Sequence, residues 1–203
     1  MTTGATEALA GVLLGLLETG DEVALLEPMY DSYQACIALS GAVTRPVTLR
    51  PPHYRLDPDE LRAAITPKTR VILVNSPHNP TGAVLDQTEL QAIADLAIEH
   101  DLIVVSDEVY EHLTYDGIKH VSIASLPGMK ERTLVISSGG KTFNTTGWKV
   151  GWVCGPAAMV AAWCCARVWS GRWGRPVRRR CPCGWRNRPS WRPRRTRGWC
   201  GSG

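Results

Sequence analysis

Hydrophobic and polar positions alternate in two different ways along residues 1–162. Short apolar runs end in polar or small residues, as the strands of a buried sheet do. Between these runs lie stretches in which apolar residues return every three or four positions, which is typical of amphipathic helices. The predicted strands are 22–28, 42–49, 70–77, 102–110, 133–138 and 150–155, and the predicted helices are 6–18, 30–40, 57–65 and 86–100.

The order of these elements predicts the fold class. Strand, helix and strand follow one another repeatedly, which favours an α/β fold with a mostly parallel sheet and helices on both faces. One helix start is well marked, since Asp86 is followed three residues later by Glu89, the pattern of a capping box. Ligands of such sheets bind beyond the carboxyl ends of the strands. Strand ends and helix starts are therefore where we expect the chemistry.

Composition divides the chain into two regions. Residues 1–162 hold all 19 acidic residues and 11 of the 23 Lys and Arg residues, a balance of −8. Residues 163–203 hold the other 12 basic residues, all Arg, so their balance of +12 gives the net charge of +4. We predict a folded domain over 1–162 and an irregular Arg/Trp/Cys-rich tail over 163–203. Guanidinium and indole groups could bind nucleic acid through this tail, but only without sequence specificity.

Several classes of protein are not indicated. No run of about 18 apolar residues predicts a membrane span, and the amino terminus lacks the pattern of a secretory signal. Only Cys36 and Cys154 lie in the first region, so a disulfide framework is not expected and a reducing cytoplasm is the predicted location. The histidines show no metal-ligand spacing, and we predict no metal site.

Two segments of small and turn-forming residues lie where an anion or a ring could bind. "TTGATEAL" (2–9) precedes a helix, so free backbone amides there could bind phosphate with help from Thr6; an ordinary helix cap is the alternative. "SPHNPTG" (76–82) follows a strand, and its two prolines would hold Asn79 rigidly. A simple tight connection has the same composition.

Charged residues follow two further strands. "VVSDEVYEHL" (104–113) places Asp107 at the end of an apolar run, where a carboxylate is costly unless it meets a cation. That cation could be a protonated heterocyclic nitrogen or an arginine in a structural salt bridge. "SSGGKTFNTTGWKVGW" (137–152) holds Lys141 between small residues, where its amine could react with an aldehyde, and Lys149, which could attract an anion. Solvated surface lysines are the alternative.

Taken together, these segments resemble the class I/II aminotransferases, which are fold type I pyridoxal-5′-phosphate (PLP) enzymes. The resemblance covers roughly residues 1 to 160 and rests on "GATEAL", "EPMYDSY", "NSPHNPTG", "SDEVY" and "SSGGKTF" with "GWKVGW". Within this family, the sequence is most similar to the branch that contains kynurenine and glutamine transaminases, cysteine-conjugate β-lyases and succinyldiaminopimelate aminotransferases. The resemblance implies that residues 1–162 form part of the large PLP-binding domain of that fold.

The resemblance implies a role for each residue that matches a family motif. Lys141 would form the Schiff base with PLP and then move the substrate α-proton. Asp107 would pair with the pyridinium nitrogen and keep it protonated. The other cofactor-binding residues are Tyr110 and Asn79 at the ring oxygen, Tyr30 on the ring face, and Ala5, Thr6, Ser138 and Lys149 at the phosphate.

The implied activity is transfer of an amino group from an amino acid to a 2-oxo acid. Two alternatives remain open: a truncated, inactive chain that at most binds PLP, and a PLP-dependent β-lyase on the same scaffold. Full-length members of the family are expected to be homodimers. Met1 lies inside the family pattern, as expected of an internal start, and the resemblance ends near residue 162. We hypothesise that the tail is a frameshifted readthrough, which resequencing the DNA around codon 162 tests; no family-like continuation in another frame would count against it.

Overall fold

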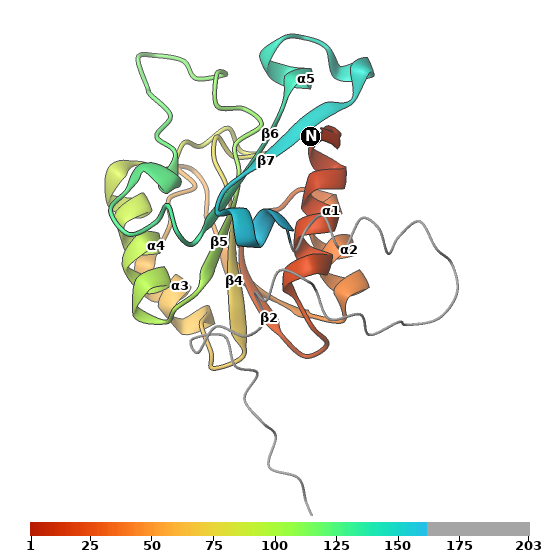
Figure 1. Ribbon diagram of the computed structural model, residues 1–203. Coiled ribbons are helices and arrows are strands. Elements are labelled where there is room, and N and C mark those ends of the chain that lie inside the picture. Colours follow the sequence, from red (N-terminus) through yellow and green to blue (C-terminus); the bar gives the residue numbers. More distant parts are fainter. Residues whose placement is uncertain (162–203) are drawn as a thin grey trace, which may run out of the picture.

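A computed structural model describes residues 1–161 (Figure 1), so the predicted tail lies outside the described residues. One seven-stranded sheet forms the centre of the described part, in the order β1-β7-β6-β5-β4-β2-β3. Its strands are β1 (Thr2–Thr3), β2 (Glu22–Glu27), β3 (Val43–Thr48), β4 (Thr69–Asn75), β5 (Ile103–Asp107), β6 (Thr133–Ser138) and β7 (Val150–Cys154).

The sheet confirms the prediction of a mostly parallel arrangement. Strands β2 to β6 pair in parallel, whereas β7 is antiparallel to both β6 and β1. All six predicted strands are present, but β1 was missed because two residues carry no periodic pattern. The strand predicted over 102–110 is shorter than expected, since β5 ends at Asp107.

Helices cover both faces of the sheet, as predicted (Figure 1). The capping box at the start of α4 is confirmed, because Asp86 and Glu89 each accept a backbone hydrogen bond from the other residue. The helices are α1 (Gly4–Leu16), α2 (Asp31–Ser40), α3 (Pro58–Ala64), α4 (Gln87–Glu99) and the single turn α5 (Gly139–Thr142), with short 3-10 turns η1 (Ile123–Ser125) and η2 (Thr146–Trp148). None of these described helices is long and apolar enough to cross a membrane.

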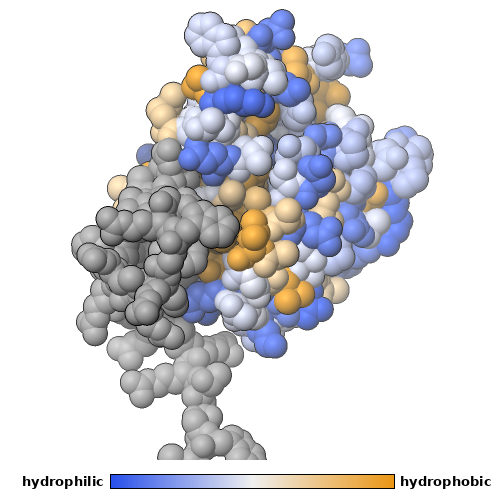
Figure 2. All heavy atoms as spheres, turned by 90° about the vertical axis from the view of Figure 1, so that its right-hand side faces the viewer, coloured by the Kyte–Doolittle hydropathy of each residue, from blue (hydrophilic) through white to orange (hydrophobic). Residues whose placement is uncertain are grey.

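Two hydrophobic cores explain this layering. Successive residues of a strand point to opposite faces, and β4 follows the rule: Val71 and Leu73 join the core under α1 and α2, and Ile72 and Val74 join the core under α3 and α4. Figure 2 looks onto the side of α1 and α2 and shows apolar patches among polar side chains. Leu39 of α2 is 73% exposed there, so this side keeps apolar surface in contact with water.

The topology gathers all the predicted chemistry at one edge of the sheet. The carboxyl ends of the parallel strands β2, β4, β5 and β6 share this edge. Because β7 is antiparallel to β6, with Ser138 opposite Gly151, its first residue lies beside the last residue of β6. Strand β1 pairs with the same part of β7, which places the start of α1 at this edge as well.

Gly151 permits the close packing of these three segments. A Cβ atom added there would lie 2.5 Å from the carbonyl carbon of Gly4 and 2.7 Å from Oγ1 of Thr2. Real Cβ atoms do not approach so closely, so any larger residue would push the start of α1 away from β7. A glycine at position 151 therefore fixes the spacing between α1 and the end of β6.

Candidate active site

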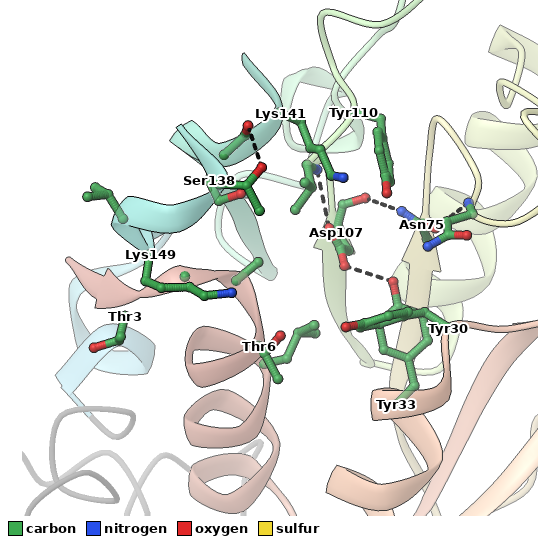
Figure 3. A pocket seen from close by; sticks show the side chains of 18 residues that line it. Thr3, Thr6, Tyr30, Tyr33, Asn75, Asp107, Tyr110, Ser138, Lys141 and Lys149 are labelled. Carbon is green, nitrogen blue, oxygen red and sulfur yellow. Dashed lines mark hydrogen bonds between the residues drawn. The ribbon is translucent and has the colours of Figure 1, made fainter. Parts of the chain in front are cut away.

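All nine residues predicted from the sequence line one cavity of about 540 Å³ at this edge of the sheet. Figure 3 labels seven of them, which come from different elements and converge on a common space: Thr6, Tyr30, Asp107, Tyr110, Ser138, Lys141 and Lys149. Nine further residues, which no motif assignment had singled out, also line it: Thr3, Gly4, Leu9, Tyr33, Asn75, Val109, Gly140, Thr146 and Val150. The structure thus brings together every predicted site residue, while the role of each stays a prediction.

Asp107 is the buried acidic group of this cavity, with 5% of its surface exposed. Its Oδ2 accepts a hydrogen bond of 2.8 Å from the hydroxyl of Tyr33, and its Oδ1 accepts one of 3.2 Å from the backbone N–H of Val109. Among residues 1–161 it forms no ion pair, so the structural salt bridge considered as an alternative is absent from the described part of the chain.

Burial decides the titration of Asp107. Removal from water raises the pKa of this carboxyl from 3.8 to about 6, while the hydrogen bonds from Tyr33 and Val109 act in the opposite direction. The neighbouring charge of Glu108 adds a small increase. A cation entering the cavity would favour the ionised carboxylate, so the site is suited to a positively charged ring nitrogen.

Lys141 lies in α5, directly beyond the end of β6. Its amine points toward Tyr110 and Asp107 (Figure 3), and the nitrogen lies 5.6 Å from the centre of the Tyr110 ring. The residue is exposed, because the cavity is open on this side. Lys141 thus lines the cavity without being buried.

The opposite end of the cavity has the features of an anion site. Helix α1 begins at Gly4, and its first turn lines the cavity together with Ser138 and Lys149. The N-cap residue Thr3 makes no side-chain cap bond, so the ordinary capping proposed as an alternative is not observed. Free N–H groups and the positive end of a helix of this length attract an anion.

Asn75 connects two strand ends in a way the sequence did not reveal. Its Nδ2 donates a 2.9 Å hydrogen bond to the backbone oxygen of Asp107, and its Oδ1 accepts one of 2.7 Å from the backbone N–H of Asn79. The loop carrying Asn79 is therefore fastened to the end of β5. A polar residue ending the apolar run of β4 was the signal that could have identified Asn75.

The described residues 1–161 contain no group of three or more His, Cys, Asp and Glu side chains able to hold a metal ion.

Comparison with known proteins decides the family. The family model described as aminotransferase class I and II matches residues 1–167. The chain belongs to the class I and II aminotransferases. This result confirms the resemblance seen in the motifs, and it confirms PLP as the cofactor of the family.

Individual aminotransferases give the same result. The probable N-succinyldiaminopimelate aminotransferase DapC of Mycobacterium tuberculosis is 55% identical over 163 residues, which cover 79% of this chain and 41% of the relative. Kynurenine–oxoglutarate transaminase 3 of Rattus norvegicus is 44% identical, over 79% of this chain and 37% of the relative. The solved structure of the M. tuberculosis N-succinyldiaminopimelate aminotransferase superimposes with a TM-score of 0.81 and 53% identity, over 83% of this chain and 44% of that one.

The chain spans about two fifths of the length of these curated aminotransferases. The residues that line the cavity fit PLP. A buried carboxylate that has two hydrogen-bond donors and no cationic partner in the described region faces the same cavity as two lysines and a helix start. The carboxylate suits a pyridinium, one lysine amine suits an aldehyde, and the other lysine and the helix start suit a phosphate.

Proposed function

We propose that this chain carries the cofactor chemistry of a PLP-dependent aminotransferase that moves an amino group from an amino acid to a 2-oxo acid. One observation supports the proposal above the others. The cavity brings together the carboxylate of Asp107, which forms no ion pair among residues 1–161, and the amine of Lys141, with a helix start and Lys149 at its far end. The pyridinium and the phosphate of PLP would each meet a group of opposite sign in this arrangement.

When bound, PLP supplies an aldehyde that condenses with an amine and a ring that accepts an electron pair. Asp107 would hold the ring nitrogen in its protonated form, which is what lets the ring accept electrons. Tyr110 and Asn79 would donate hydrogen bonds to the ring oxygen, and Tyr30 would pack on the ring face. Lys141 would bond to the aldehyde and, once released, would take the substrate α-proton and return it to a different carbon.

The phosphate end would fix the orientation of the cofactor. Ala5 and Thr6 in the first turn of α1 would offer backbone N–H groups and one hydroxyl. Ser138 and Lys149 come from the two ends of the β6–β7 connection, so they would approach the phosphate from the other side. Rigid placement at this end keeps the aldehyde within reach of Lys141.

Reductive trapping tests the proposal. The purified chain is mixed with PLP, reduced with borohydride, digested and mapped by mass spectrometry, with Lys141→Ala and the exposed-lysine control Lys130→Ala treated in parallel. We expect one dominant pyridoxyl adduct on Lys141, which the control retains and Lys141→Ala loses. Labelling spread evenly over surface lysines would refute the proposal.

A second candidate is cofactor binding without transamination. The described residues that line the cavity include two lysines but no arginine, the side chain best suited to a bidentate grip on a substrate carboxylate. A β-lyase on the same scaffold is a third possibility, since PLP carries the chemistry and the protein selects the bond. Absorbance spectra recorded while amino acids and then 2-oxo acids are added separate these outcomes. Only an aminotransferase converts the bound cofactor reversibly between its aldehyde and amine forms.

We extend the proposal to a cytoplasmic homodimer. Large apolar side chains are exposed in the segments that follow Tyr110 and Lys141: Leu113, Tyr115, Ile118, Phe143 and Trp148. Exposed apolar residues clustered beside a cavity are a common property of subunit interfaces. Cys36 and Cys154 are both free, which agrees with a reducing compartment. Sedimentation analysis with and without PLP tests the dimer.

A further inference from the structure

We propose that Tyr33 is a positioning residue that keeps the Asp107 carboxylate ionised and fixed in direction, and that holds the Tyr30 ring beside it. The inference rests on the proposed PLP site but concerns a residue to which the family motifs assign no role. Tyr33 lies in α2, 74 residues before Asp107, and the fold brings the two side chains into contact. Figure 3 shows Tyr33 below Asp107, with its hydroxyl directed at the carboxylate.

The contact is a buried hydrogen bond to a charged group. The Tyr33 hydroxyl donates to Oδ2 of Asp107 at 2.8 Å, and only 2% of Tyr33 is exposed. Hydrogen bonds to charged groups are roughly twice as strong as those between neutral groups. No other side chain in the described part of the protein donates to this carboxylate. Tyr33 is therefore the side chain that opposes the effect of burial on Asp107.

In this hydrogen bond the Tyr33 hydroxyl remains the donor and the Asp107 carboxylate remains the acceptor. Burial first, and then the charge of Asp107, raises the pKa of the Tyr33 hydroxyl well above its usual range, so the phenol keeps its proton and remains the donor. The other titratable groups near the pair are Glu108, next in the chain, and the phenols Tyr30 and Tyr110. Lys141 lines the same cavity. Among the titratable side chains of the described residues, only Tyr33 makes a direct hydrogen bond to Asp107.

Tyr33 also contacts the residue proposed to cover the cofactor ring. The rings of Tyr30 and Tyr33 meet edge to face, with centres 5.6 Å apart and planes at 80°. Edge-to-face pairs of this kind hold their rings in a defined orientation. One side chain thus supports two walls of the cavity, the carboxylate and the aromatic ring.

The test starts with the apoprotein, so it does not depend on cofactor binding. The protein is labelled with carbon-13 at its aspartate carboxyl groups, and the Asp107 signal is identified by its loss in Asp107→Asn. We expect Tyr33→Phe to raise the pKa of Asp107 by about one unit, the size of one hydrogen bond to a charged group. The matched control is Tyr54→Phe, a partly buried tyrosine packed against the core on the other face, which should leave the titration unchanged.

A second variant guards against misfolding of Tyr33→Phe. Replacing Tyr33 alone by 3-fluorotyrosine keeps its shape but makes its phenol a stronger donor, so the pKa of Asp107 should move downward. PLP titrations at neutral pH complete the test: Tyr33→Phe should weaken binding about tenfold, and much less when Asp107 is already Asn. An Asp107 that titrates at the wild-type pH in folded Tyr33→Phe overturns the inference. A shifted titration without any PLP binding supports the role of Tyr33 and refutes the proposed function instead.

Discussion

Two neighbouring carboxylates at the end of β5 have opposite surroundings. Asp107 and Glu108 are both buried, with 5% and 2% of their surfaces exposed. Asp107 faces the cavity and accepts one side-chain hydrogen bond. Glu108 accepts three, from the Ser106 and Ser122 hydroxyls at 2.8 Å each and from Nε2 of His120 at 3.0 Å.

This difference separates a group that stabilises the fold from a group that we propose binds the cofactor. Ser106 precedes the segment 109–122, whereas His120 and Ser122 lie at its far end, so the carboxylate fastens that segment, which carries Tyr110, to the sheet. Buried charges that are fully hydrogen-bonded stabilise a single arrangement of their surroundings. Asp107 lacks such compensation in the described part of the chain, and its pKa is raised for that reason. Adjacent acidic residues can therefore be assigned different roles from their partners alone.

The largest expected effect is the loss of the structural carboxylate. Glu108→Ala leaves Ser106, Ser122 and His120 without their shared acceptor in a buried place, so unfolding free energy should fall by about 3 kcal/mol or more. Urea denaturation of the apoprotein measures it. Glu131→Ala, which removes an exposed carboxylate, is the control and should change stability little. An equally stable Glu108→Ala protein would show that the cluster does not hold the segment.

Removing the Asp107 carboxylate should change the free energy of unfolding in the opposite direction. The folded-state pKa of Asp107 lies near 6, above its ordinary value of 3.8, so its contribution to stability is present at low pH and is lost as pH rises through about 6. Asp107→Asn does not titrate and should make the apoprotein more stable by about 1 to 3 kcal/mol at pH 7.5.

Thermal unfolding across the pH range checks this prediction. The stabilising effect of Asp107→Asn should shrink as the pH falls toward 4, and PLP binding at pH 7.5 should weaken at least tenfold. A variant that is less stable than the wild type at every pH would contradict the assignment of Asp107 as an uncompensated carboxylate.

The smallest effects come from a matched pair of serines. Ser122→Ala removes one hydrogen bond to Glu108 and should cost about 1 kcal/mol of stability with little change in PLP affinity. Ser138 lines the cavity and takes no part in the Glu108 cluster. Ser138→Ala should therefore leave stability unchanged but weaken PLP binding. Denaturation measures the stability of both variants, and fluorescence titration measures their PLP affinity. Equal results for the two serines would contradict the different roles assigned to Glu108 and to the cavity.

Much of the fold followed from local patterns. The apolar runs at 70–77 and 133–138 predicted buried strands because neither face of a central strand meets water. The site was predictable because each motif lies at a strand end or helix start, and parallel strands place such ends at one edge.

What the sequence did not predict depends on contacts between distant segments. Tyr33 of α2 and Asp107 of β5 are 74 residues apart and meet only in the folded chain, so no spacing in the sequence encodes their contact. The two-residue strand β1 is defined by its partner β7 rather than by its own residues. The antiparallel direction of β7 was also not predicted, although it is what brings Lys149 back beside Ser138.

The pairing of β1 with β7 has a consequence for synthesis of the protein on the ribosome. Thr2 and Thr3 precede all other described strands in the sequence, but among the described strands their only partner is β7, close to the end of the described range. Until Val150 and Gly151 leave the exit tunnel, the start of α1 has no strand to fix its position. The parallel strands can form earlier, as each emerges in turn. The end of the cavity proposed to bind the phosphate can therefore form only after the parallel strands of the described sheet have been synthesised.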